Sequence, residues 1–173
     1  MDEHTALKSS FAPVTDARTR LLVLGSLPGE VSLRQAQYYA HPQNQFWRLM
    51  GEVVGADLVS ARYESRLAML RSAGVGLWDV VRTARRAGSL DTAIRDHQPN
   101  ALAELAAALP ALRAIAFNGG KASALGRAAL IRADLGADSG WTLVDLPSSS
   151  PAYTIGFERK RIEWLKLTPF LQP

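Results

Sequence analysis

Short apolar runs alternate with helical stretches along this chain. The first run comprises residues 21–24 and ends at Gly25, which is typical of a strand buried on both faces. Similar runs predict strands at 75–81, 114–117 and 142–146. Because strands that alternate with helices indicate a parallel sheet covered on both faces, we expect an α/β protein with a four-stranded parallel sheet.

Helical patterns occupy the stretches between these runs. We expect helices at 45–54, 61–72, 99–108, 121–131 and 157–167. Proline is compatible with the first turn of a helix, so Pro99 fits the start of its helix. The apolar side chains expected to face the core in the last helix are Ile162, Trp164, Leu165 and Leu167. Its charged residues, expected to face water or a partner, are Glu158, Arg159, Lys160 and Arg161.

The chain has 173 residues, of which 47% are hydrophobic. This length suits one core and is short for two, so we expect one domain over residues 1–173, with an irregular N-terminal segment at 1–18. The N-terminus is acidic and polar, unlike a signal peptide, and no stretch has the ~18 apolar residues of a membrane span. The sequence therefore predicts a cytoplasmic protein.

The chain contains no cysteine. This excludes disulfides, a thiolate nucleophile, a thiolate zinc site and a cysteine-ligated iron–sulfur cluster. The histidines at 4, 41 and 97 lie far apart and form no HxxxH or HxH pair, so we expect no metal and no cofactor. Lys and Arg number 20 against 16 Asp and Glu, a net charge of +4 that permits a polyanionic partner.

Ligands of open α/β sheets bind outside the carboxyl ends of the strands. The loop after the first strand reads GSLPG at 25–29 and continues to YYAHPQNQFW at 38–47. Glycine and proline permit tight turns and close backbone approach, and the aromatic and polar side chains suit a pocket for a flat ring. Trp47 is expected in the core. Asn44 fits both a helix cap and a chemical role.

The loop after the last strand carries three serines between Pro147 and Pro151. Their hydroxyl and backbone N–H groups suit the oxygens of a phosphate, although a plain surface loop has the same composition. The chain has no GxSxG, Walker A or GxGxxG motif, so an α/β-hydrolase elbow and a nucleotide loop are unsupported.

The motifs of these loops resemble those of the uracil-DNA glycosylase superfamily, most closely its hypoxanthine-DNA (deoxyinosine) glycosylase branch. They are GSLPG at 25–29, YYAHPQNQFW at 38–47, LWDV at 77–80, SLD at 89–91, FNG at 117–119 and LPSSSPA at 146–152. The resemblance implies a three-layer α/β/α fold and a monofunctional DNA glycosylase of base excision repair. Such an enzyme flips out a deaminated base, here hypoxanthine, and hydrolyses its N-glycosidic bond to leave an abasic site.

The first loop departs from one branch of the superfamily. Mismatch-specific uracil and thymine glycosylases carry GxNPG there, with an asparagine that positions water, whereas this chain has Leu27. Leucine cannot orient water. In the hypoxanthine branch the asparagine of HPxN is implicated in catalysis, and it corresponds to Asn44. Because an amide is not basic, we expect Asn44 to hold water through its carbonyl oxygen and to steady another group through its NH₂.

The resemblance also implies the residues that bind base and DNA. Tyr39 is expected to stack on the flipped base and Asn118 to read its edge. The expected base-binding residues are Gly25, Ser26, Leu27, Pro28, Tyr39, His41, Phe117 and Asn118. Those expected to hold the flanking phosphates and enter the gap left by the base are Ser148, Ser149, Ser150, Pro151 and Ala152.

Further polar residues have both structural and functional interpretations. Asp79, near the end of an expected strand, fits a structural cap better than an active carboxylate. Arg82, Arg85 and Arg86 form a basic cluster that suits a DNA backbone.

The expected partner is DNA with a deaminated base, bound by a monomer. The alternatives are a mismatch-specific uracil/thymine glycosylase and a non-catalytic flavodoxin-like domain that binds a nucleotide or damaged DNA.

Overall fold

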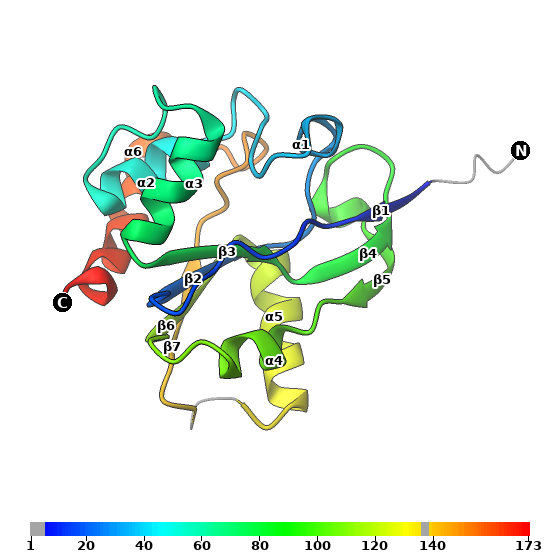
Figure 1. The fold of residues 1–173 in the computed structure, drawn as a ribbon. Helices are drawn as coiled ribbons and strands as arrows, with labels where there is room; N and C mark the ends of the chain where they lie inside the picture. The colour runs from blue at the N-terminus through cyan, green and yellow to red at the C-terminus, as the bar shows by residue number, and fades with distance from the viewer. Residues whose placement is uncertain (1–5, 136–138) are drawn as a thin grey trace, which may run out of the picture.

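The computed structural model describes residues 6–135 and 139–173 (Figure 1). Its centre is a four-stranded parallel sheet with the strand order β3–β2–β6–β7. The strands are β2 (Leu21–Gly25), β3 (Val75–Asp79), β6 (Ala114–Asn118) and β7 (Thr142–Leu146). The register of β2 pairs Val23 with Leu77 on one side and Ala116 on the other. The predicted parallel sheet is therefore confirmed.

Helices cover both faces of this sheet (Figure 1). Leu21 and Val23 pack into a core shared with α2 (Phe46–Val54), α3 (Tyr63–Ser72) and α6 (Phe157–Trp164). Leu22 and Leu24 pack into a second core with α4 (Leu102–Ala107) and α5 (Gly120–Arg132). Since alternate residues of a strand point to opposite faces, a wholly apolar β2 requires both layers. The three-layer α/β/α fold is confirmed.

A second, antiparallel sheet was not predicted. It has the order β1–β4–β5, with β1 (Leu7–Ser9), β4 (Val81–Arg85) and β5 (Arg95–Pro99). The apolar run expected as one strand is thus two strands, and β1 falls within the segment expected to be irregular. Pro99 ends β5 instead of starting a helix. Because β5 lies at the edge of this sheet, it tolerates a proline, which has no N–H to donate.

Short helical segments complete the described chain. Helix α1 (Glu30–Gln35) follows the loop after β2, and the 3₁₀ helix η1 (Asp91–Ala93) precedes β5. Another 3₁₀ helix, η3 (Leu165–Leu171), continues α6. No helix in the two described ranges is both long and apolar enough to span a membrane.

Helix α6 anchors the loop after β7. Its Trp164 is fully buried and donates its indole N–H to the carbonyl of Pro147 at 2.9 Å. Lys160, which the sequence placed in water or at a partner, is only 1% exposed and donates from Nζ to the carbonyl of Ser150 at 3.0 Å. Ile162, expected in the core, is 55% exposed. The helix is therefore rotated so that Lys160 faces the loop.

Replacing Lys160 with alanine is expected to destabilise the fold by about 1–3 kcal/mol, since it leaves the Ser150 carbonyl without its ammonium donor. Urea unfolding measures this change. Lys166→Ala is the matched control: this lysine is exposed and pairs with Glu163, so its loss is expected to cost no more than about 0.5 kcal/mol. Equal effects of the two changes would show that Lys160 does not hold the loop.

Candidate active site

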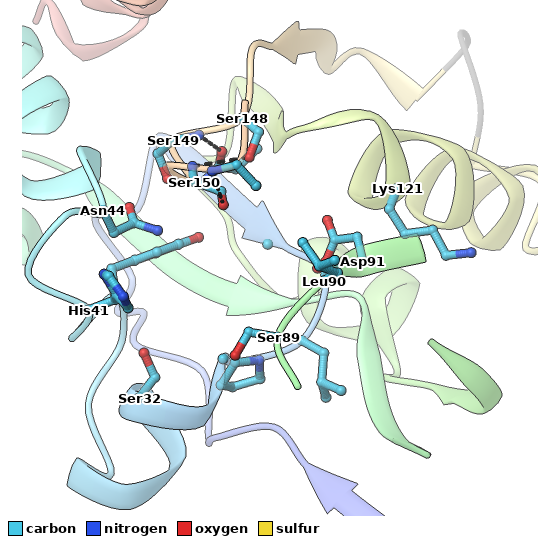
Figure 2. A pocket seen from close by; sticks show the side chains of 18 of the residues that line it. Ser32, His41, Asn44, Ser89, Leu90, Asp91, Lys121, Ser148, Ser149 and Ser150 are labelled. Carbon is cyan, nitrogen blue, oxygen red and sulfur yellow. Dashed lines mark hydrogen bonds between the residues drawn. The ribbon is translucent and has the colours of Figure 1, made fainter. Parts of the chain in front are cut away.

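A cavity of about 880 Å³ opens at the carboxyl end of the parallel sheet (Figure 2). Gly25, Asp79 and Asn118, the last residues of β2, β3 and β6, line it together. The other lining residues come from the loop after β2, the first turns of α1 and α5, the segment before α2, residues 89–92 and the loop after β7. The position agrees with the rule for ligand sites in open α/β sheets.

Nearly all residues that the sequence assigned to base or DNA lie at this cavity. Those lining it are Gly25, Ser26, Leu27, Pro28, Tyr39, His41, Asn44, Asn118, Ser148, Ser149, Ser150, Pro151 and Ala152. Phe117 is the exception. It is fully buried in the core below α5, where a Cβ on Gly126 would lie 2.4 Å from its ring, so the Phe117 side chain packs against the helix and does not line the cavity.

Asn44 lies one residue before Gln45, which is the N-cap residue of α2 in place of Asn44. Asn44 Oδ1 accepts the backbone N–H of Phe46 at 3.0 Å, which satisfies a donor at the start of α2. This bond fixes the amide, because only the oxygen can accept an N–H. The NH₂ group is then directed into the cavity (Figure 2), and the second lone pair of Oδ1 remains available to water.

Tyr39 already stacks on another ring. Its centroid lies 3.8 Å from that of Phe46, with 15° between the planes. Its hydroxyl reaches the cavity floor, where a Cβ on Gly25 would lie 2.9 Å from it. Burial, followed by the charge of Asp79, raises the pKa of Tyr39, so the phenol stays neutral. A base that stacks on Tyr39 must use the ring face that Phe46 leaves free.

We call residues 148–153 the serine loop, and Asn118 holds it at the sheet edge. The Ser149 N–H donates to Asn118 Oδ1, and Asn118 Nδ2 donates to Ser149 Oγ, both at 2.9 Å. The Ser149 carbonyl accepts the N–H of Gln45 at 3.0 Å. Ser149 is 1% exposed. Its polar groups thus join the loop to β6 and α2, and they are not presented to a phosphate as the sequence suggested.

The two flanking serines have a different arrangement. Ser148 Oγ accepts the N–H of Ser150 at 3.1 Å, and Ser150 Oγ accepts the N–H of Ala152 at 3.2 Å. Such local bonds use the oxygen as acceptor and leave the hydroxyl hydrogen to donate. Ser148 and Ser150 therefore retain the donors that a phosphate oxygen needs.

Arg86 is buried beneath the loop that follows β2 and forms hydrogen bonds with its backbone. It is 1% exposed, and its guanidinium donates to the carbonyls of Leu27, Pro28 and Gly88. The sequence placed Arg86 on a basic DNA-binding face, which is wrong because its donors are used within the protein. Arg82 and Arg85 are exposed on β4.

His41 and Leu27 lie on different parts of the cavity lining. His41 is exposed, and its Nδ1 accepts the N–H of Gln43 at 3.1 Å, which leaves Nε2 as the donor of the neutral ring. Leu27 is 6% exposed and packs into the core on the α4 and α5 side. Neither its chemistry nor its packing allows it to orient water.

Asp79 was interpreted as a structural cap, but its carboxyl group lies at the cavity. It is 3% exposed, and its Oδ2 is buried with no hydrogen-bond partner among the described residues. Burial, followed by the charge of Asp91, raises the pKa of Asp79 to about 7. The sequence feature that could have revealed this position is an acidic residue at the end of an otherwise apolar strand.

In the described part of the chain, no group of three or more acidic or histidine side chains forms a metal-binding cluster.

The family follows from comparison with known proteins. Residues 12–170 match the model of the uracil DNA glycosylase superfamily. The chain belongs to this superfamily. It is accordingly an enzyme, a DNA glycosylase that hydrolyses N-glycosidic bonds. The fold agrees: a structure solved by NMR in solution, described as a candidate uracil DNA glycosylase from Methanosarcina acetivorans, superposes with a TM-score of 0.82 at 38% identity. That comparison covers 96% of this chain and 99% of the other.

Two similar relatives of this glycosylase are named hypoxanthine DNA glycosylase. The protein from Methanosarcina acetivorans is 39% identical over 158 residues, which cover 91% of this chain and 96% of the relative. The protein from Methanosarcina barkeri is 47% identical over 114 residues, which cover 66% of this chain and 72% of the relative.

Proposed function

We propose that this DNA glycosylase excises hypoxanthine from DNA in base excision repair and leaves an abasic site. The observation that carries the proposal is the Asn44 amide, held by Phe46 N–H and directed into a cavity at the sheet edge. Two similar relatives are named for the same substrate. The described residues are proposed to act as one monomeric, cytoplasmic glycosylase domain.

The cavity supplies separate groups for the base and for the DNA backbone. Ser148 and Ser150 have hydroxyl hydrogens free to donate to the flanking phosphates. The carbonyl of Ser150 accepts a hydrogen bond from the Lys160 ammonium group, which fixes the position of the loop. Pro151 and Ala152 follow on the same loop and line the cavity, where they would occupy the gap left in the duplex. The flipped base would enter between this loop and Tyr39.

Hydrolysis needs a water molecule held beside the sugar and a leaving base that is stabilised as the bond breaks. Asn44 can hold water through its remaining lone pair and donate through NH₂, but it cannot take a proton. Leu27 stands where uracil and thymine enzymes carry their water-positioning asparagine, which favours the hypoxanthine assignment over that alternative. Exclusion of bulk water from the cavity strengthens each of these contacts.

The proposal is tested with duplex oligonucleotides that carry deoxyinosine, uracil, xanthine or a thymine mismatch. We expect release of free hypoxanthine from the deoxyinosine duplex, and strand breakage only after heating in alkali, because a monofunctional enzyme leaves an intact abasic site. A matched duplex with deoxyadenosine is the control. Binding of the deoxyinosine duplex without base release would instead support a damaged-DNA binding domain, and faster release of uracil would change the substrate.

A further inference from the structure

Of the three acidic side chains that line the cavity within the described chain, Asp79 alone has a buried oxygen that makes no hydrogen bond. Glu30 pairs with Lys8. Asp91 Oδ1 accepts the Ser26 hydroxyl at 2.5 Å. Asp79 has a buried Oδ2 that no described group meets. An unsatisfied polar atom at this depth costs stability and calls for an explanation in terms of a ligand or a proton.

The end of β2 packs directly against this carboxyl group. A Cβ on Gly25 would lie 2.5 Å from Asp79 Oδ1 and 2.9 Å from the Tyr39 hydroxyl, so a side chain at this position would clash with both oxygens, and glycine lets them lie together at the cavity lining. The Tyr39 hydroxyl is also buried and makes no hydrogen bond of good geometry in the described structure, although the nearby Asn118 side chain acts against the rise of its pKa. Buried polar groups with unused hydrogen-bonding capacity beside a cavity of about 880 Å³ indicate a site for a hydrogen-bonding ligand.

We propose that Asp79 is the general acid of the reaction and donates its carboxyl proton to a ring nitrogen of the departing purine. The inference rests on the proposed excision of hypoxanthine. The bond between C1′ and N9 breaks with its electron pair going to the purine, which receives the Asp79 proton and leaves as neutral hypoxanthine. Water adds its oxygen to C1′, and the proton that it releases restores the carboxyl group through solvent. The step therefore balances as the addition of one water molecule.

The surroundings of Asp79 suit a carboxyl group that is protonated near neutral pH. Burial raises its pKa most, the Asp91 charge adds to this, and the buried Arg86 guanidinium acts in the opposite direction, with a net pKa of about 7. Tyr38 and Tyr39 also face it, and both stay neutral because burial raises the pKa of each phenol. A general acid is most effective when its pKa lies near the working pH.

The test is the pH dependence of single-turnover excision from a deoxyinosine duplex, with enzyme below saturation. Since the protonated form is required, the wild-type rate is expected to fall about tenfold per pH unit above about pH 7. Asp79→Asn is expected to lose about 10²–10⁴ of the rate at pH 6 and to show no such fall. Asp91→Asn is expected to move the fall to lower pH, because the charge that raises the Asp79 pKa is gone.

A stability measurement separates this role from a structural one. The folded pKa of Asp79 is raised, so the contribution of Asp79 to stability is full below its unfolded pKa and is lost as pH rises through about 7. Asp79→Asn is therefore expected to melt no lower than wild type at pH 8. A wild-type rate that rises through pH 7, or an Asp79→Asn rate within threefold of wild type, would overturn the inference. If the wild-type enzyme releases no hypoxanthine at any pH, the proposed function itself fails.

Discussion

Replacing Asn44 with alanine is expected to slow hypoxanthine excision by about 10²–10³-fold, or ~2.7–4 kcal/mol of transition-state stabilisation. The reason is the loss of a fixed amide that faces the cavity. The rate is measured in single turnover with saturating enzyme on a deoxyinosine duplex, so that weaker DNA binding does not enter the result. A rate equal to wild type would remove Asn44 from the mechanism.

Alanine also removes the bond from Phe46 N–H, which is expected to cost about 0.5–2 kcal/mol of stability. Asn44→Asp separates the two effects, since a carboxylate still accepts that N–H but has no NH₂ to donate. We expect Asn44→Asp to keep the stability and to lose activity. Gln43→Ala, an exposed neighbour, is the matched control and is expected to retain both. If Asn44→Asp is fully active, the amide acts through its oxygen alone.

Trp164→Ala is expected to destabilise the fold by about 3–5 kcal/mol, the usual range for removing a buried aromatic ring. Trp164 is fully buried and makes an edge-to-face contact with Phe46 at 5.8 Å between centroids. It also holds the Pro147 carbonyl at the start of the serine loop. Urea denaturation measures the loss, which is a large fraction of the stability of an ordinary domain.

Two further variants show which contact matters. Trp164→Phe keeps most of the ring but removes the N–H that donates to the Pro147 carbonyl. We therefore expect it to lower the free energy of unfolding by about 1–3 kcal/mol and to leave the serine loop less firmly attached to α6. Ile162→Ala, on the same helix and 55% exposed, is expected to change stability by no more than about 0.5 kcal/mol. An Ile162→Ala effect as large as that of Trp164→Ala would contradict the packing of α6 described above.

Local sequence patterns predicted those strands and helices whose own residues indicate how deeply they are buried. The apolar run that became β2 is buried on both faces, and a strand of that kind requires a helical layer on each side. Helices α2 and α3 lie within two residues of their predicted limits. The antiparallel sheet was missed because β5 is exposed along its whole length, so it carries no apolar pattern.

The sequence by itself thus determined the α/β class, the parallel sheet and the edge at which the site lies, because the carboxyl ends of parallel strands meet at one edge. Only the tertiary structure decided which polar groups are free to act there. Lys160 is buried against the serine loop and Arg86 against the loop after β2, and Ser149 is bonded to Asn118 across the sheet edge. Asp79 lines the cavity beside Gly25, where any side chain would clash with the carboxyl group. Burial and hydrogen bonding depend on how separate elements pack together in space, which no local pattern specifies.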